Sequence, residues 1–103
     1  MENQSAPQSL SVQQTLSERG KRYGTFESHS LIAQSLKSVM ALSANWPSLT
    51  TYQKQALEVI ADKIARILNG DPNYLDNWHD IAGYSLLVED ILAKLNQTSD
   101  QPS

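Results

Sequence analysis

The sequence predicts an all-α fold, a small antiparallel bundle of three main helices preceded by a short N-terminal helix. Two observations carry this prediction: apolar residues recur at helical spacing in three segments, and residues that end helices separate those segments. No segment alternates apolar and polar residues with a period of two, so no sheet is expected. The connections are short, which predicts that neighbouring helices are roughly antiparallel.

The two ends of the chain differ in composition from its middle. Residues 1–15 are mostly polar and residues 96–103 read NQTSDQPS, so both lack the apolar side chains that offset the loss of chain entropy. We therefore expect disordered tails over 1–15 and 96–103 and one helical domain over 16–95. A short first helix is expected from about Val12 to Arg19, followed by a loop from Gly20 to Gly24 that its two glycines delimit.

The first two main helices have clear boundaries. The first is predicted from about Glu27 to Ser43 and stops before Pro47, because proline disfavours helical geometry at the residue that precedes it. The second begins after Ser48 or Thr50, either of which can cap it, and ends at Asn69-Gly70, which tolerates the left-handed conformation of a helix C-terminus. The apolar positions of the second helix are Leu57, Ile60, Ala61, Ile64, Ile67 and Leu68.

The third main helix is predicted to start near Asp76, which is a plausible N-cap, and to end near Leu95. Its apolar stripe consists of Ile81, Tyr84, Val88, Ile91, Leu92 and Leu95. About 80 structured residues bury only about 60% of the surface of the unfolded chain. Such a small interior cannot cover Leu31, Met40, Trp78 and Leu87 at once, so the sequence predicts a homo-oligomer.

Composition excludes several classes of protein. The net charge is −3 and the pI is about 5.2, which argues against a general nucleic-acid-binding protein. The chain has no cysteine, so it has neither disulfides nor thiolate metal sites. No apolar run approaches the roughly 18–20 residues that span a bilayer, and no signal peptide is evident. We therefore expect a cytoplasmic protein that does not bind membranes.

Two pairs of carboxylates are candidates for chemistry. Asp76 and Asp80 are one helical turn apart, and Asp80 falls on the flank of the apolar face, where a carboxylate needs a cation, a metal or several donors. Glu58 and Asp62 form a second pair, and carboxylates on two facing helices can hold Mg²⁺. The alternatives are that Asp76 caps its helix, that Asp80 pairs with Lys or Arg, and that Asp62 pairs with Arg66 on a solvated face.

Basic residues gather in two places. Arg19, Lys21 and Arg22 precede Tyr23, and Lys63 and Arg66 lie on the second main helix. Five cations of this kind can clamp a phosphate chain in an otherwise acidic protein. The alternative is ordinary pairing with Glu18, Glu27 and Asp80.

Three blocks of residues carry a resemblance to a known family. They are Glu18-Arg19-x₃-Tyr23-Gly24, then Lys63-x₂-Arg66-x₂-Asn69-Gly70, then Asp76-x-Trp78-x-Asp80-x-Ala82-Gly83-Tyr84. Together they resemble an uncharacterised family of small phage and prophage proteins, which implies the cytoplasm of a bacterial host. The layout is distantly similar to the MazG-like all-α nucleoside triphosphate pyrophosphohydrolases.

The MazG-like resemblance implies an Mg²⁺ site and a reaction. Mg²⁺ would be held by Glu58, Asp62 and Asp80 with Asp76 assisting, and Asp80 and Glu58 would be the catalytic residues. The cations and Tyr23 would bind the nucleotide. The chain departs from that pattern, because Asn77 stands where an acidic ligand is expected and the second-helix pair is spaced i, i+4 instead of i, i+3.

Two functions therefore follow from the sequence. The first is Mg²⁺-dependent binding of a nucleotide, with release of pyrophosphate as the candidate reaction. The second is a non-catalytic helical phage accessory module that binds a host or phage protein.

Overall fold

The protein is described here by a computed structural model, which covers residues 2–100 and the side chains of residues 11–97. Its elements are α1 (Glu2–Tyr23), α2 (Phe26–Ala41), the short 3-10 helix η1 (Trp46–Ser48), α3 (Thr51–Asn69) and α4 (Leu75–Asp100). No strand occurs within residues 2–100. The predicted all-α fold is confirmed.

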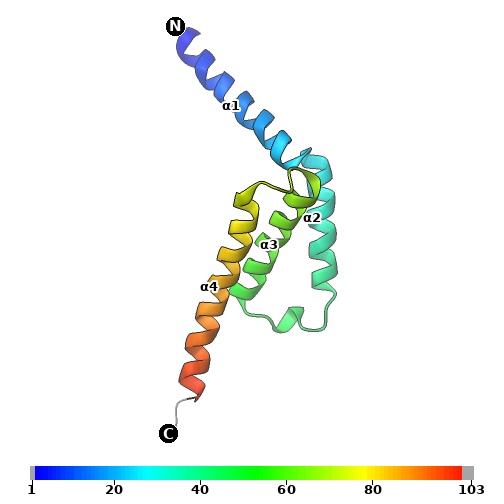
Figure 1. The fold of residues 1–103 in the computed structure, drawn as a ribbon. Coiled ribbons are helices and arrows are strands. Elements are labelled where there is room, and N and C mark those ends of the chain that lie inside the picture. The colour runs from blue at the N-terminus through cyan, green and yellow to red at the C-terminus, as the bar shows by residue number, and fades with distance from the viewer. Residues whose placement is uncertain (1, 101–103) are drawn as a thin grey trace.

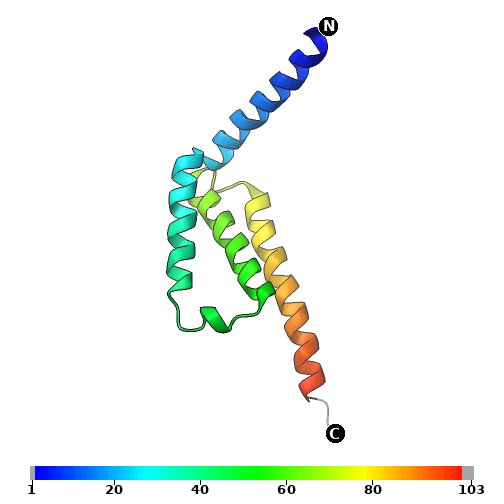
Figure 2. The ribbon, with the colours of Figure 1, turned by 180° about the vertical axis from the view of Figure 1, so that it is seen from behind.

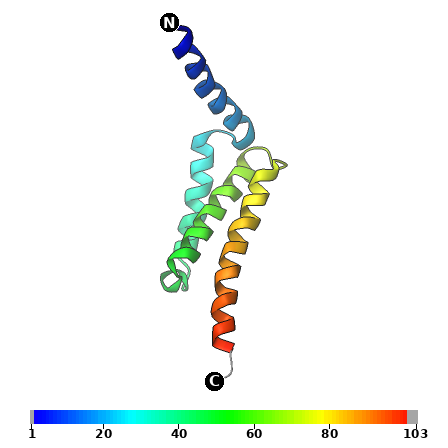
Figure 3. The ribbon, with the colours of Figure 1, turned by 90° about the vertical axis from the view of Figure 1, so that its left-hand side faces the viewer.

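Three helices form the bundle and the fourth is an arm. α3 lies between α2 and α4, and each connection reverses the direction of the chain (Figures 1 and 3). α1 touches the bundle only at its C-terminal end and projects away from it (Figure 2). The molecule is consequently elongated, measuring 71 × 30 × 25 Å.

Local side-chain chemistry explains where α2 and α3 begin. Thr50 is the N-cap of α3, and its hydroxyl accepts from the backbone N–H of Gln53 at 3.2 Å while the Gln53 side chain accepts from the N–H of Thr50 at 2.9 Å. This reciprocal pair satisfies backbone donors that helix geometry leaves open. Thr25 caps α2 with a single bond of this kind, because its hydroxyl accepts from the backbone N–H of Ser28. The prediction of a Thr50 cap is therefore confirmed, and α4 begins at Leu75, one residue before the predicted cap Asp76.

The interior is made of small side chains. The fully buried apolar residues are Ala33 on α2 and Ala56, Ala61 and Ala65 on α3. Alanines let helix backbones approach closely, but each buries little apolar surface. Larger members of the predicted stripes are only partly covered: Leu68 is 66% exposed and Leu57 40% exposed.

One prediction about the N-terminal part needs correction. The predicted loop from Gly20 is helical, because α1 continues through Lys21 and Arg22 to Tyr23 and only Gly24 and Thr25 interrupt the helices. A single glycine in a helix costs only about 1 kcal/mol, which neighbouring helix formers can offset. α1 begins at Glu2 and α4 ends at Asp100, so both helices extend into the segments where tails are expected, and the disorder of those segments stays a prediction. Helical hydrogen bonds are local, so a helix can extend without apolar partners.

Much of the apolar surface lies open. Leu31 and Val39 on α2 are 71% and 68% exposed, and Leu87 and Leu95 on α4 are 62% and 54% exposed. None of the helices described is long and apolar enough to cross a membrane. Exposed large apolar residues thus occur along α2 and α4, and also on α1 and α3.

Candidate functional site

The turn between α1 and α2 is bound tightly to the C-terminal end of α3. The Asn69 side-chain amide donates to the backbone carbonyls of Tyr23 and Thr25, the latter at 3.0 Å. Gly24 has a φ of +79°, and its backbone lies so close to Asn69 that a Cβ has no room. Gly70 fits equally closely against the Arg22 carbonyl, which accepts a hydrogen bond from the N–H of Asp71. The two glycines are therefore required by close backbone approach.

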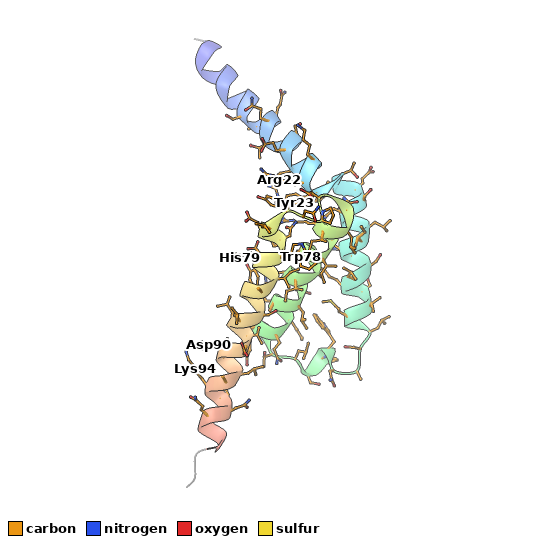
Figure 4. All side chains as sticks on the ribbon, in the orientation of Figure 1. Arg22, Tyr23, Trp78, His79, Asp90 and Lys94 are labelled. Carbon is orange, nitrogen blue, oxygen red and sulfur yellow. The ribbon has the colours of Figure 1, made fainter. Side chains whose placement is uncertain are left out.

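Cations and aromatic rings stack next to this contact between the α1–α2 turn and the C-terminal end of α3. The Arg66 guanidinium lies 4.6 Å from the centroid of the Tyr23 ring, and the Arg19 guanidinium lies 5.8 Å from the same ring. Tyr23 also meets Tyr74 edge to face at 6.2 Å, and Arg22 covers the Tyr74 ring at 4.7 Å. Figure 4 shows Arg22 and Tyr23 at the end of α1, next to the loop between α3 and α4. Residues from separate parts of the chain thus make one cluster.

A pocket of about 480 Å³ opens beside the cluster, and we call it the Arg19–Arg66 pocket. α1 contributes Leu16, Arg19, Gly20 and Tyr23, the turn and α2 contribute Gly24, Thr25, Phe26 and His29, and α3 contributes Arg66. Its volume lies within the range of about 300–1,000 Å³ that is usual for small-molecule sites. Neither Arg19 nor Arg66 forms a salt bridge with a described carboxylate. The pocket therefore combines two guanidinium groups that form no salt bridge among the described residues with aromatic walls.

His29 is one of the residues that line the pocket. Its ring stacks with Phe26 at 6.2 Å, and its Nδ1 is buried with no hydrogen-bond partner among the described protein atoms. Burial lowers the pKa of His29 below its ordinary value of 6.5, and the nearby Arg66 cation lowers it further. The imidazole is consequently neutral at neutral pH, and it offers the pocket an aromatic surface.

The predicted carboxylates are held by lysines. Asp62 pairs with Lys37 of α2 at 3.0 Å, so the expected Asp62–Arg66 pair is wrong, because Arg66 instead lies on Tyr23. Asp80 pairs with Lys63 at 2.9 Å, and this hydrogen bond lowers the pKa of Asp80. The structure thus favours the alternative in which Asp80 serves an ion pair.

The remaining two carboxylates lie elsewhere. Asp76 accepts a hydrogen bond from the Tyr74 hydroxyl at 3.0 Å, and Glu58 makes no ion pair with any described residue. Over the side chains of 11–97, no three histidine, cysteine or acidic groups lie close enough to share a metal ion. The arrangement does not fit an Mg²⁺ site built within one copy from Glu58, Asp62, Asp76 and Asp80, and Mg²⁺ binding itself stays a prediction.

The predicted cations separate into two groups. Arg19, Tyr23 and Arg66 come together in the pocket, whereas Lys21 is exposed and Arg22 pairs with Glu18 at 3.4 Å and faces Tyr74. Lys63 is committed to Asp80. Asn69, Thr25, Phe26 and His29 were not predicted as site residues. Gly24 and Asn69-Gly70 could be recognised in the sequence as positions where the backbone turns. Nothing local in the sequence indicates that these two segments contact each other.

Comparison with known proteins places the chain in one family. No curated protein and no solved structure matches it. A family profile matches residues 11–92, which include all three of the blocks described above and the whole Arg19–Arg66 pocket. On that match the chain belongs to the family described as "Domain of unknown function (DUF6378)".

Proposed function

We propose that this protein binds a nucleotide, or a chemically similar ring compound that carries phosphate, in the Arg19–Arg66 pocket. The observation that carries the proposal is the placing of two guanidinium groups, neither paired with a described carboxylate, around one tyrosine at a pocket of about 480 Å³. Guanidinium groups bind phosphate oxygens through paired, charge-assisted hydrogen bonds. Phosphate is therefore the ligand group that this charge pattern suits.

The aromatic wall supports a ring on the same ligand. Phe26 is 82% exposed although it lies at the pocket, and it is already stacked with His29. A heterocyclic base packed on Phe26 would cover apolar surface that is now open to water. Thr25, whose hydroxyl also caps α2, lines the same pocket.

The Arg19–Arg66 pocket is not lined by any of the predicted metal-binding carboxylates. Nucleotide binding there can therefore be tested separately from catalysis. The pyrophosphate release that the MazG-like resemblance implies stays a prediction, as does a phage or prophage origin. We also propose that the protein is a homo-oligomer, because large apolar residues on α2 and α4 are exposed.

Calorimetric titration tests the binding proposal. ATP, AMP, tripolyphosphate and adenosine are titrated into the full-length protein, with and without Mg²⁺. We expect ATP and AMP to bind, and adenosine to bind at least tenfold more weakly than AMP because it lacks phosphate. Absence of binding by all four probes would overturn the proposal. A pyrophosphate assay on the ATP and Mg²⁺ sample separately tests hydrolysis.

Matched variants locate the site. Arg66→Ala and Arg19→Ala are each expected to weaken AMP binding about tenfold or more, which corresponds to about 1.4 kcal/mol for one charged hydrogen-bonding group. Lys21→Ala removes a cation of the same segment that is exposed and lies outside the pocket, so affinity should not change. Equal losses in Lys21→Ala and Arg66→Ala would show general charge attraction instead of a pocket.

A further inference from the structure

The apolar stripe of α4 continues beyond the bundle. In its first half the stripe packs on α3, and the cavity between the two helices is lined on the α4 side by Tyr84, Ser85 and Val88. The next hollow along the helix, on the side of Val88 and Leu92, is lined by α4 residues alone. Figure 1 shows the C-terminal part of α4 projecting past the end of α3. We call residues 87–97, whose first turn still reaches the cavity beside α3 at Val88, the α4 extension.

The open face of the α4 extension is a ridge of three large apolar residues. Leu87, Ile91 and Leu95 are spaced four residues apart, so they lie on one side of the helix, and they are 62%, 37% and 54% exposed. A ridge at this spacing is the pattern that packs against a second helix. Charged residues stand at one flank of the ridge, where Asp90 and Lys94 form a salt bridge at 3.2 Å (Figure 4).

We propose that the α4 extension pairs in an antiparallel arrangement with the α4 extension of a second copy of this chain. Antiparallel pairing about a two-fold axis brings identical flanks of the two helices together. The flank that carries Asp90 and Lys94 then meets its own copy in the reversed direction, so each acid lies near the lysine of the second copy. The two intrachain Asp90–Lys94 pairs are thus placed so that opposite charges face each other across the contact, which is the self-complementarity that a two-fold interface requires.

The same geometry pairs the apolar residues. With the axis at Ile91, the two Ile91 side chains meet each other, and Leu87 of each copy meets Leu95 of the other. The bundles lie at opposite ends of this contact, because the extension projects from only one end of each copy (Figures 1 and 2). Side chains that are more than half exposed in one chain become buried in the pair.

Site-specific cross-linking distinguishes this arrangement from others, since the chain has no native cysteine. Single-cysteine variants of the full chain are treated with a short bismaleimide. Ile91→Cys should cross-link to itself, whereas Leu87→Cys and Leu95→Cys should cross-link only when the two variants are mixed. Parallel pairing would cross-link all three variants alone and would overturn the antiparallel geometry. Absence of any cross-link would overturn the interface.

Light scattering with a matched pair of variants provides the second test. Wild type should have twice the mass of one chain, and Ile91→Glu should raise the dissociation constant at least tenfold. Leu86→Glu is the control, because Leu86 is on the same helix and 61% exposed but lies away from the ridge. Circular dichroism checks that both variants remain helical. A monomeric wild type at 100 µM, or equal dissociation in the two variants, would refute the proposal.

Discussion

Replacing Gly24 with alanine tests the contact between the α1–α2 turn and the end of α3, on which the Arg19–Arg66 pocket depends. Gly24 combines a φ of +79° with a backbone so near Asn69 that an added Cβ would collide with its carbonyl and its side-chain amide. Gly20, four residues earlier, lies inside α1, and a Cβ there would meet no atom within 4 Å. The two glycines look alike in the sequence, so their different surroundings make a matched comparison.

The expected loss can be worked out from two contributions. A left-handed backbone costs a residue with a Cβ about 1–2 kcal/mol. Displacing Asn69 also weakens its hydrogen bonds to the carbonyls of Tyr23 and Thr25, each of which contributes about 0.5–1.5 kcal/mol. We therefore expect Gly24→Ala to destabilise the native structure by about 2–4 kcal/mol. Gly20→Ala should instead stabilise it by about 0.5–1 kcal/mol, because alanine is the better helix former.

Two measurements together detect this effect. Urea unfolding reports the free energy of the whole domain, and amide exchange at Asp71 reports whether its hydrogen bond to the Arg22 carbonyl remains. If strain is relieved by detaching the turn from α3, the Asp71 amide should exchange at least tenfold faster even where the bundle stays folded. Unchanged unfolding and unchanged exchange in Gly24→Ala would refute the reasoning.

Three further predictions concern single interactions. The stability of wild type should fall as the pH drops below 6.5, because the pKa of His29 is lower in the folded chain than in the unfolded chain, which therefore binds the proton more readily. His29→Gln should remove that part of the pH dependence of Tm. Asp80→Ala should be less stable in urea than the double variant Lys63→Met/Asp80→Ala. The single change leaves the Lys63 ammonium without its carboxylate, and the Lys63 side chain is only 14% exposed. Equal losses of stability in the two variants would contradict this. Thr50→Ala should cost about 1 kcal/mol in thermal unfolding by removing the α3 cap, and a neutral result would show that the capping contact with Gln53 is not stabilising.

The helices were the most predictable part of the fold. The boundaries of α3 at Thr50 and at Asn69-Gly70 were confirmed. The Thr50 cap depends on interactions within a few residues. Gly70, in contrast, has a φ of −131° instead of the expected left-handed conformation, and its close approach to the Arg22 carbonyl explains the glycine there. The extent of α1 was not predictable from composition. Its residues from 11 to 21 are exposed, so no packing pattern marks them, and one glycine was insufficient to end the helix.

Some partners of the charged residues were among the alternatives that the sequence offered, such as Lys63 for Asp80 and Glu18 for Arg22, whereas the partner of Asp62 was not. Asp62 has Arg66 one turn away on its own helix, yet its carboxylate binds Lys37 of α2. Arg66 turns to Tyr23, which precedes it by more than forty residues. Surface ion pairs within a helix are worth only about 0.3–0.5 kcal/mol, so packing between helices easily redirects them.

What the sequence alone determined is therefore local: the all-α class, the caps and stops of α3, the small hydrophobic interior, and the presence of three blocks rich in cations, aromatics and glycine. The tertiary structure decided which of those residues meet. It brought Arg19, Tyr23 and Arg66 to one pocket, left Lys21 in solvent, and paired two predicted metal ligands with lysines. The physical reason is that helix formation depends on neighbours in sequence, whereas pairing among several equally suitable charges depends on the distances that packing creates.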